Sequence, residues 1–154
     1  MLCASLFGCV FGDPTIKIHD IRMMKFGYSV NNSMYGNVLY KIEFSDGVYT
    51  AAVKLYDVPD EEAVVFTVNE AFVRELETML VSYDVGKWNG FNKSNKHVLD
   101  GNNFHMYIKC GDSDDYDKTY LSASGYHKWP KNYSAVRSEI SALFEKHMPK
   151  TANQ

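Results

Sequence analysis

Residues 38–53 read VLYKIEFSDGVYTAAV, and this stretch contains the strongest fold signal in the chain. In its first half, every second residue from Val38 to Phe44 is apolar, which is the pattern of a half-buried strand. Asp46-Gly47 follows, and this dipeptide between two alternating runs is the strongest short-range signal of a β-hairpin. The sequence therefore predicts a pair of antiparallel strands, the second of which covers residues 48–55.

Further strands are predicted on both sides of this hairpin. Upstream, Ile16 and Ile18 alternate with polar residues, and residues 21–30 form a second candidate strand before a turn at Asn31-Asn32-Ser33. Downstream, an acidic turn over residues 57–62 precedes a short apolar strand over residues 63–66. The stretch from residue 16 to residue 66 therefore predicts a β-meander.

Two amphipathic helices are predicted in the rest of the chain. The first spans residues 67–83: Thr67-Val68-Asn69-Glu70 matches a capping box, and the apolar residues that follow recur at helical spacing. The second spans residues 133–148, with Asn132 as a side-chain N-cap and Pro149 beyond its end. The apolar stripes are Phe72, Leu76, Met79, Leu80 and Tyr83 in the first helix and Tyr133, Val136, Ile140, Leu143, Phe144 and His147 in the second.

The segment between the two helices predicts a second hairpin. A loop over residues 87–103 precedes a strand over residues 104–108, and an acidic loop over residues 110–118 precedes a strand over residues 119–123, which Ser124-Gly125 ends. Strands and helices are grouped rather than alternating, which favours the α+β class over a parallel doubly wound sheet. We therefore predict a single α+β domain over residues 1–154. Its antiparallel sheet is a meander plus a later hairpin, both helices pack on one face, and residues 149–154 fray.

Composition and charge narrow the function classes. The 154 residues are 45% hydrophobic and carry a net charge of −3, which disfavours a dedicated nucleic-acid binder. No apolar run reaches the roughly 18 residues of a membrane span. The three cysteines, Cys3, Cys9 and Cys110, do not form a disulfide framework, so we expect reduced thiols and a cytoplasmic protein. A lipoprotein anchored through Cys9 is the alternative, although we expect residues 1–12 to form a buried strand or short helix.

A search for catalytic and metal-binding patterns predicts neither a catalytic residue nor a metal or other cofactor. The chain has no Cys-x-x-Cys, no His-Glu-x-x-His, no Gly-x-Ser-x-Gly and no phosphate-binding glycine loop. The acidic loop around Asp114 lacks the glycine and glutamate of a calcium-binding EF-hand. These absences favour a non-catalytic binding protein of the inhibitor, immunity or adaptor type, whose partner is another protein. The alternative is a small hydrolase or transferase with a site assembled from Asp100, His105 and His127.

Two similar loops carry the only tryptophans in the chain. One reads KWNGFNK over residues 87–93, and the other reads HKWPKNY over residues 127–133. Exposed Trp and Tyr are favoured interface anchors, and neighbouring lysines suit an anionic partner. The opposing interpretation is that the tryptophans hold their loops onto the sheet, and we expect this of at least one of them. The candidate binding residues are Trp88, Asn89, Phe91, Lys93, Tyr126, Trp129 and Lys131.

The second half of the chain also carries a distinctive series of short motifs. Trp88-Asn89-Gly90-Phe91 is followed by Leu99-Asp100-Gly101, then by Ala123-Ser124-Gly125-Tyr126, and finally by Pro130-Lys131-Asn132-Tyr133. This series resembles a group of small uncharacterised proteins from anaerobic Gram-positive bacteria that share WNGF, LDG, ASGY and P-x-NY before a final helix. The resemblance covers roughly residues 81–144. It implies a bacterial intracellular origin and a shared α+β fold, and it implies no function.

Overall fold

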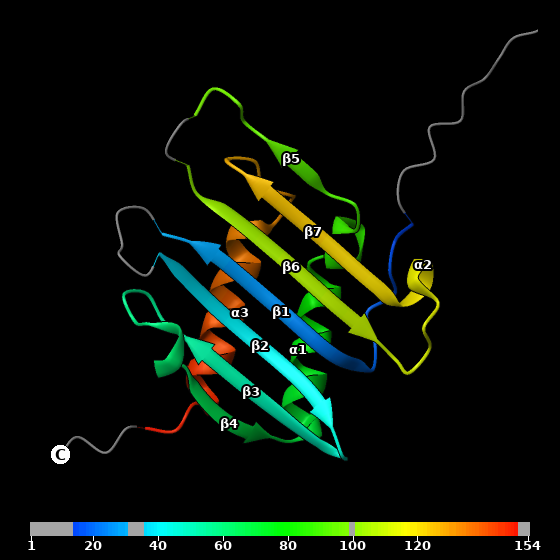
Figure 1. Cartoon of the computed structure of the whole chain (residues 1–154). Helices are drawn as coiled ribbons and strands as arrows, with labels where there is room; N and C mark the ends of the chain where they lie inside the picture. The colour runs from blue at the N-terminus through cyan, green and yellow to red at the C-terminus, as the bar shows by residue number, and fades with distance from the viewer. Residues whose placement is uncertain (1–13, 31–35, 99–100, 151–154) are drawn as a thin grey trace, which may run out of the picture.

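The computed structural model describes residues 14–30, 36–98 and 101–150 of the chain. Within these ranges, seven strands form one sheet in the order β4-β3-β2-β1-β6-β7-β5. Helices α1 (Glu70–Ser82) and α3 (Tyr133–His147) cover one face of this sheet (Figure 1). The predicted α+β class and the mostly antiparallel sheet are confirmed. The strands are β1 (Ile21–Ser29), β2 (Asn37–Ser45), β3 (Val48–Lys54), β4 (Val64–Val68), β5 (Asn92–Ser94), β6 (Asn103–Cys110) and β7 (Tyr120–Tyr126).

The β2–β3 hairpin turns at Asp46-Gly47. Ser45 pairs with Val48, so the turn has two central residues, and both have positive φ angles, 53° and 79°. A two-residue turn of this kind matches the right-handed twist of the flanking strands, and Asp-Gly adopts it readily. The remaining neighbouring strands also pair antiparallel, except that β5 runs parallel to β7. The central β1–β6 pair joins the two halves of the chain.

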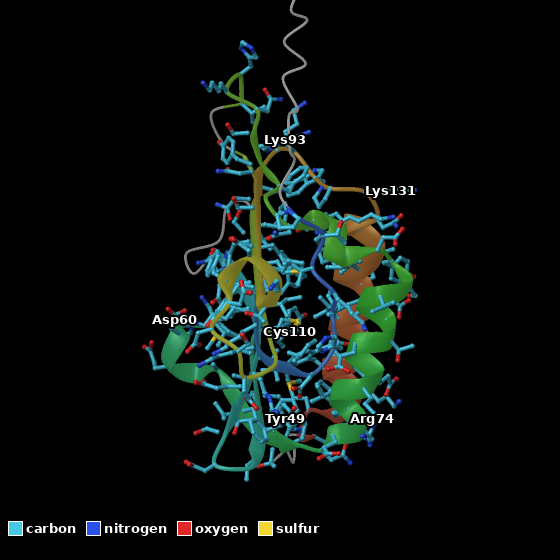
Figure 2. All side chains as sticks on the ribbon, turned by 90° about the vertical axis from the view of Figure 1, so that its right-hand side faces the viewer. Tyr49, Asp60, Arg74, Lys93, Cys110 and Lys131 are labelled. Atoms are coloured by element: carbon cyan, nitrogen blue, oxygen red, sulfur yellow. The ribbon has the colours of Figure 1, made fainter. Side chains whose placement is uncertain are left out.

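The hydrophobic core lies between the sheet and the two helices. Alternate residues of the strands point toward the helices, and the apolar stripes of α1 and α3 face them. Aromatic rings connect the layers: the ring of Phe144 in α3 lies 5.1 Å from Tyr40 of β2 and 5.2 Å from Phe72 of α1, in edge-to-face geometry. This geometry is the favoured arrangement for aromatic pairs. In Figure 2 the sheet is seen edge-on, with the helices on one side and Asp60 of the short η1 helix (Asp60–Glu62) on the other.

The predicted strand around Ile16 and Ile18 is wrong. Both side chains are buried as the alternation requires, but the segment belongs to no strand of the described sheet. Instead, the amide of Ile16 donates a hydrogen bond of 3.1 Å to the carbonyl of Gly86, beyond the end of α1. The segment is therefore joined to the turn that follows α1 rather than to a strand, and it lies between the sheet and the helices (Figure 2). Apolar alternation predicts which side chains are buried, but it does not predict whether a neighbouring strand is available for pairing.

The predicted start of the first helix and both predicted N-caps differ from the structure, whereas the second helix begins at Tyr133 as predicted. Thr67 is the paired partner of Thr50 in the β3–β4 ladder, so the predicted capping box does not form. The N-cap of α1 is Asn69, whose side chain accepts a hydrogen bond of 3.0 Å from the amide of Phe72. Asn132, at the start of α3, has a left-handed backbone and makes no side-chain cap. Its side-chain amide instead donates to the carbonyl of Tyr83, at 3.2 Å.

Three further differences lie between the helices. The predicted loop over residues 87–103 includes the whole of strand β5 and the end of the short helix η2 (Val85–Trp88), which begins just before the loop. The predicted acidic loop includes most of a single helical turn, α2 (Tyr116–Thr119). Strand β7 continues through Ser124-Gly125, because Gly125 leaves room for the Phe104 ring and the backbone of Lys128. The predicted turn at residues 31–33 and residues 151–154 of the expected frayed tail lie outside the described residues.

Candidate functional site

Trp88 belongs to the core. It ends helix η2, which follows α1 after Asp84 adopts a left-handed backbone. Only 3% of Trp88 is exposed, and its ring lies 6.3 Å from the rings of both Phe104 and Tyr133. Its indole Nε1 donates a hydrogen bond of 3.0 Å to the carbonyl of Lys131. The interpretation of Trp88 as an exposed binding residue is therefore wrong, because the packing of η2 against β6 and α3 encloses its ring.

Trp129, in contrast, is exposed. Its exposed fraction is 40%, and its ring stacks on Tyr133 at 4.7 Å with an interplanar angle of 14°. Tyr133 is itself buried as the first residue of α3, so it holds the inner face of the indole in a defined orientation. The adjacent Pro130 is also buried and restricts the backbone of the loop. Trp129 is therefore a fixed aromatic surface rather than a mobile side chain.

The two tryptophan loops enclose one open cavity, which we call the Trp129 pocket. Its volume is about 390 Å³. Its lining contains three lysines, one carboxylate and both tryptophans: Tyr83, Asp84, Lys87, Trp88, Phe91, Lys93, Trp129, Pro130 and Lys131. Figure 2 shows Lys93 and Lys131 at the same end of the molecule, one on the sheet side and the other on the helix side. The two tryptophan loops therefore lie at one end of the molecule.

The pocket is locally basic although the chain as a whole is acidic. Lys87 forms an ion pair of 3.1 Å with Asp84, and both side chains are largely exposed. The amine of Lys93 lies 5.4 Å from the centre of the Phe91 ring, which is a cation–π distance. Within the described residues, neither Lys93 nor Lys131 has a carboxylate partner. The two ammonium groups beside Trp129 are therefore available to an anionic partner.

Two of the predicted binding residues, Asn89 and Tyr126, make structural hydrogen bonds away from the Trp129 pocket. The side chain of Asn89 accepts from the amide of Ser122 at 3.1 Å and donates to the carbonyl of Pro14 at 2.9 Å. It therefore joins the N-terminal segment to the edge of β7. The hydroxyl of Tyr126 donates to the carbonyl of Val98 at 3.0 Å and accepts from the amide of Gly101 at 2.9 Å. Neither residue lines the Trp129 pocket.

The alternative catalytic group is not assembled by the described residues. The ring of His105 lies against Gly27 of β1, and burial, with a contribution from Lys25, lowers its pKa. The ring of His127 lies against Gly101, and its Nε2 atom has no hydrogen-bond partner among the described residues. The third member, Asp100, lies outside those residues. The two histidines thus have different surroundings, and no hydrogen bond between them occurs in the described part of the chain.

Three of the four aspartates in the acidic loop pair with basic side chains. Asp112 pairs with Arg22 at 3.2 Å, Asp114 with Lys109 at 3.3 Å, and Asp115 with Lys118 at 2.9 Å. Across residues 14–30, 36–98 and 101–150, no group of three or more His, Cys, Asp or Glu side chains could hold a metal ion.

In the same ranges, no helix has the length and apolar character to cross a membrane.

Cys110 is a free, buried thiol at the end of β6. Burial raises its pKa, and Glu77 and Asp20 contribute in the same direction. A raised pKa reduces the thiolate fraction at neutral pH, which is the wrong direction for a nucleophile. The Cys110 thiol is therefore poorly suited to act as a nucleophile, and the main cause is burial. Cys3 and Cys9 lie outside the described residues.

Sequence reasoning misses Tyr83 and Lys87, which line the Trp129 pocket, and Tyr133, which stacks against Trp129. Local patterns place Tyr83 only in a helix stripe, Lys87 only beside Trp88, and Tyr133 only in the core. Tyr133 follows Trp129 by four residues, but Trp129 precedes the helix, so helical spacing does not predict their stacking. The sequence contains only a weak signal for this pocket: Tyr83 ends the apolar stripe of the first helix, and Lys87 follows it in the loop.

No protein-family model matches this chain, and a comparison with curated proteins finds no match either. The resemblance to a bacterial group therefore stays a prediction.

Proposed function

We propose that this chain is a non-catalytic binding module whose partner is another protein, and that the Trp129 pocket is its contact surface. The observation that carries the proposal is Trp129, which is 40% exposed yet held by Tyr133. Binding to an ordered aromatic side chain loses little conformational entropy, and Trp is among the residues most enriched at interface hot spots. The exposed ring therefore has the properties of an anchor.

The lysines beside Trp129 indicate the chemistry of the partner surface. Lys93 and Lys131 lie on opposite sides of the pocket and have no carboxylate partner within the described ranges. A complementary surface carries carboxylates at its rim and an aromatic or aliphatic group at its centre, because this arrangement satisfies both the charges and the exposed indole. A protein surface or peptide segment rich in Asp and Glu fits this description. The cytoplasmic location of the chain is a separate prediction that this surface does not test.

Site-specific photocrosslinking tests this proposal and captures a partner whose identity is unknown. A photoreactive phenylalanine analogue replaces Trp129 in cells that express the protein natively, and a matched variant carries it at Val65, which is exposed on β4. We expect a discrete protein adduct from position 129 that position 65 does not give. Adducts that resist protease and disappear with nuclease would contradict a protein partner, as would identical adducts at both positions.

Once the partner is identified, substitutions separate the aromatic anchor from the lysines. We expect Trp129→Ala to weaken binding by about tenfold to thirtyfold, which is typical of an anchor residue. Lys93→Ala combined with Lys131→Ala should slow association and reduce its salt dependence, because exposed charges act mainly on the association rate. Unchanged affinity in both variants, with circular dichroism showing an intact fold, would contradict the proposed surface.

A further inference from the structure

A second concave region lies beside the edge of β7. Its chemistry differs from that of the Trp129 pocket, although Phe91 lines both. It has a volume of about 330 Å³, and we call it the tyrosine cleft. The residues that determine its chemistry are Asn92, Tyr116, Asp117, Tyr120, Ser122 and Ser124. No lysine, arginine or histidine is among its described lining residues, so the cleft offers neutral hydroxyl and amide groups, two phenol rings and one carboxylate.

Tyr116 supplies a flat and accessible aromatic face. Its exposed fraction is 60%, and its ring stacks on Tyr120 at 4.8 Å with an interplanar angle of 14°. Tyr120 is held in turn by Tyr107, at 5.7 Å, and by the Lys109 amine, 5.4 Å from the centre of its ring. One face of the Tyr116 ring is therefore supported by a fixed neighbour. An exposed aromatic ring supported in this way is suited to stacking on a ligand.

The polar wall of the cleft is held in place by the backbone around it. The carbonyl of Ser122 accepts from the amide of Gly90 at 2.9 Å, and the amide of Ser124 donates to the carbonyl of Phe91 at 2.8 Å. Asn89 bonds the amide of Ser122. These bonds occupy the edge of β7, so a peptide cannot add to that edge as a further strand. The groups that face the cleft are therefore side chains, and the backbone that carries them is fixed by these hydrogen bonds.

Hydrogen-bonding capacity remains on that wall. The hydroxyl of Ser124 donates to the side-chain oxygen of Asn92 at 3.4 Å, which leaves the Asn92 amide hydrogens unpaired within the described residues. The Ser122 hydroxyl and the Tyr116 hydroxyl have no protein partner there either. Amide and hydroxyl groups can both donate and accept, so they match a ligand that presents several hydroxyls. Asp117 is a further acceptor, and it repels an anion.

We propose that the tyrosine cleft binds a neutral oligosaccharide. A pyranose ring presents an apolar face of C–H bonds to an aromatic ring, here Tyr116, and hydroxyls around its rim, here toward Asn92, Ser122 and Asp117. A phosphorylated or sulfated ligand is disfavoured because the lining lacks a cation and contains a carboxylate. This inference goes beyond the proposed protein-binding function and involves a different surface.

The test is an NMR titration of the full chain with neutral oligosaccharides of the gluco, xylo, manno and chito series. We expect at least one series to bind with a Kd of about 1 mM or tighter, and to shift the backbone amides of residues 89–92 and 116–124. Tyr116→Ala should weaken that binding by about tenfold or more, while Tyr116→Phe should retain it. The matched control Tyr56→Ala removes another exposed tyrosine and should leave binding unchanged.

Other results would overturn the proposal. These are no binding in any series, amide shifts that map away from the cleft, full affinity in Tyr116→Ala, or tighter binding of a sulfated analogue than of its neutral parent. Trp129→Ala should leave saccharide binding intact. If it abolishes both protein and saccharide binding, the two surfaces act as one and the separate cleft is wrong.

Discussion

The indole Nε1 of Trp88 donates a hydrogen bond to the carbonyl oxygen of Lys131, over a distance of 3.0 Å and a sequence separation of 43 residues. This bond joins the two loops that contain the only tryptophans. Because Trp88 is buried, its N–H needs a partner, and the Lys131 carbonyl is held beside Trp129 as a result. The buried tryptophan thus helps to position the exposed one.

Replacing Trp88 should therefore affect stability far more than replacing Trp129. We expect Trp88→Ala to lower the free energy of unfolding by about 3–5 kcal/mol, because a large cavity forms in the core. Trp88→Phe keeps most of the packing but loses the hydrogen bond, which should cost about 1–3 kcal/mol. Trp129→Ala serves as the control, with an expected loss below about 1 kcal/mol. Urea denaturation measures all three, and equal losses for the two Trp→Ala variants would contradict the assignment.

Fluorescence should distinguish the two tryptophans individually. In the Trp88→Phe variant only Trp129 emits, and we expect emission toward the red with quenching by iodide, since its ring is exposed. In the Trp129→Phe variant only Trp88 emits, and we expect blue-shifted emission that resists iodide. Two unquenchable, blue-shifted tryptophans would eliminate Trp129 as a binding surface.

The helix stripes predict which truncations are costly. Leu76 and Ile140 are fully buried between the sheet and the helices, so Leu76→Ala and Ile140→Ala should each cost about 2–5 kcal/mol. Val81, on the same helix as Leu76, is exposed, and Val81→Ala should change stability by less than about 0.5 kcal/mol. Losses below about 0.5 kcal/mol at both buried sites would mean that the helix faces are assigned incorrectly.

Gly125 should tolerate no side chain. A β-carbon there would overlap the Lys128 carbonyl and the ring of Phe104, so Gly125→Ala should cost about 1–3 kcal/mol or more through overpacking. The control is Gly27→Ala, whose β-carbon meets the His105 ring first, and this exposed ring can move away toward solvent. Chemical denaturation of both variants tests the difference, and a Gly125→Ala variant as stable as Gly27→Ala would contradict the close backbone approach.

Stability should fall at alkaline pH through Tyr40. Burial raises the pKa of Tyr40 to about 12, although its hydrogen bond to Ser141 acts in the opposite direction. The unfolded chain loses this proton near pH 10 and the folded chain only near pH 12. The favourable contribution is therefore complete below about pH 10 and is lost as the pH rises toward 12.

The Tyr40→Phe variant provides the comparison for this pH effect. It should lose about 1 kcal/mol at pH 7, because the hydrogen bond to Ser141 is absent. Its stability should then decline less steeply than that of the native chain between about pH 10 and 12, since no phenol proton is released. Urea unfolding at a series of pH values measures both slopes, and parallel curves would show that Tyr40 does not titrate as a buried group.

Local patterns predicted the elements whose signals depend on nearby residues. Asp46-Gly47 predicted the β2–β3 turn because a two-residue hairpin needs positive φ angles that these residues adopt. The stripe from Phe72 to Leu80 predicted the buried face of α1 because helical periodicity is a local property. By contrast, Thr67 satisfied a capping pattern and still became part of β4, because pairing with Thr50 of a preceding strand was available.

The sequence by itself determined that this chain has strand-forming and helix-forming segments with defined apolar faces, and that Lys-Trp occurs twice in loops next to the helices. Tertiary structure alone decided that Trp88 is enclosed while Trp129 is exposed. Both residues have the same local signal, but exposure depends on which distant elements cover a side chain. Phe104 and Tyr133 lie around Trp88, with the Lys131 carbonyl accepting its N–H. Tyr133 and Phe104 also pack against the Trp129 ring, but 40% of Trp129 stays exposed because no further element of the described chain covers it.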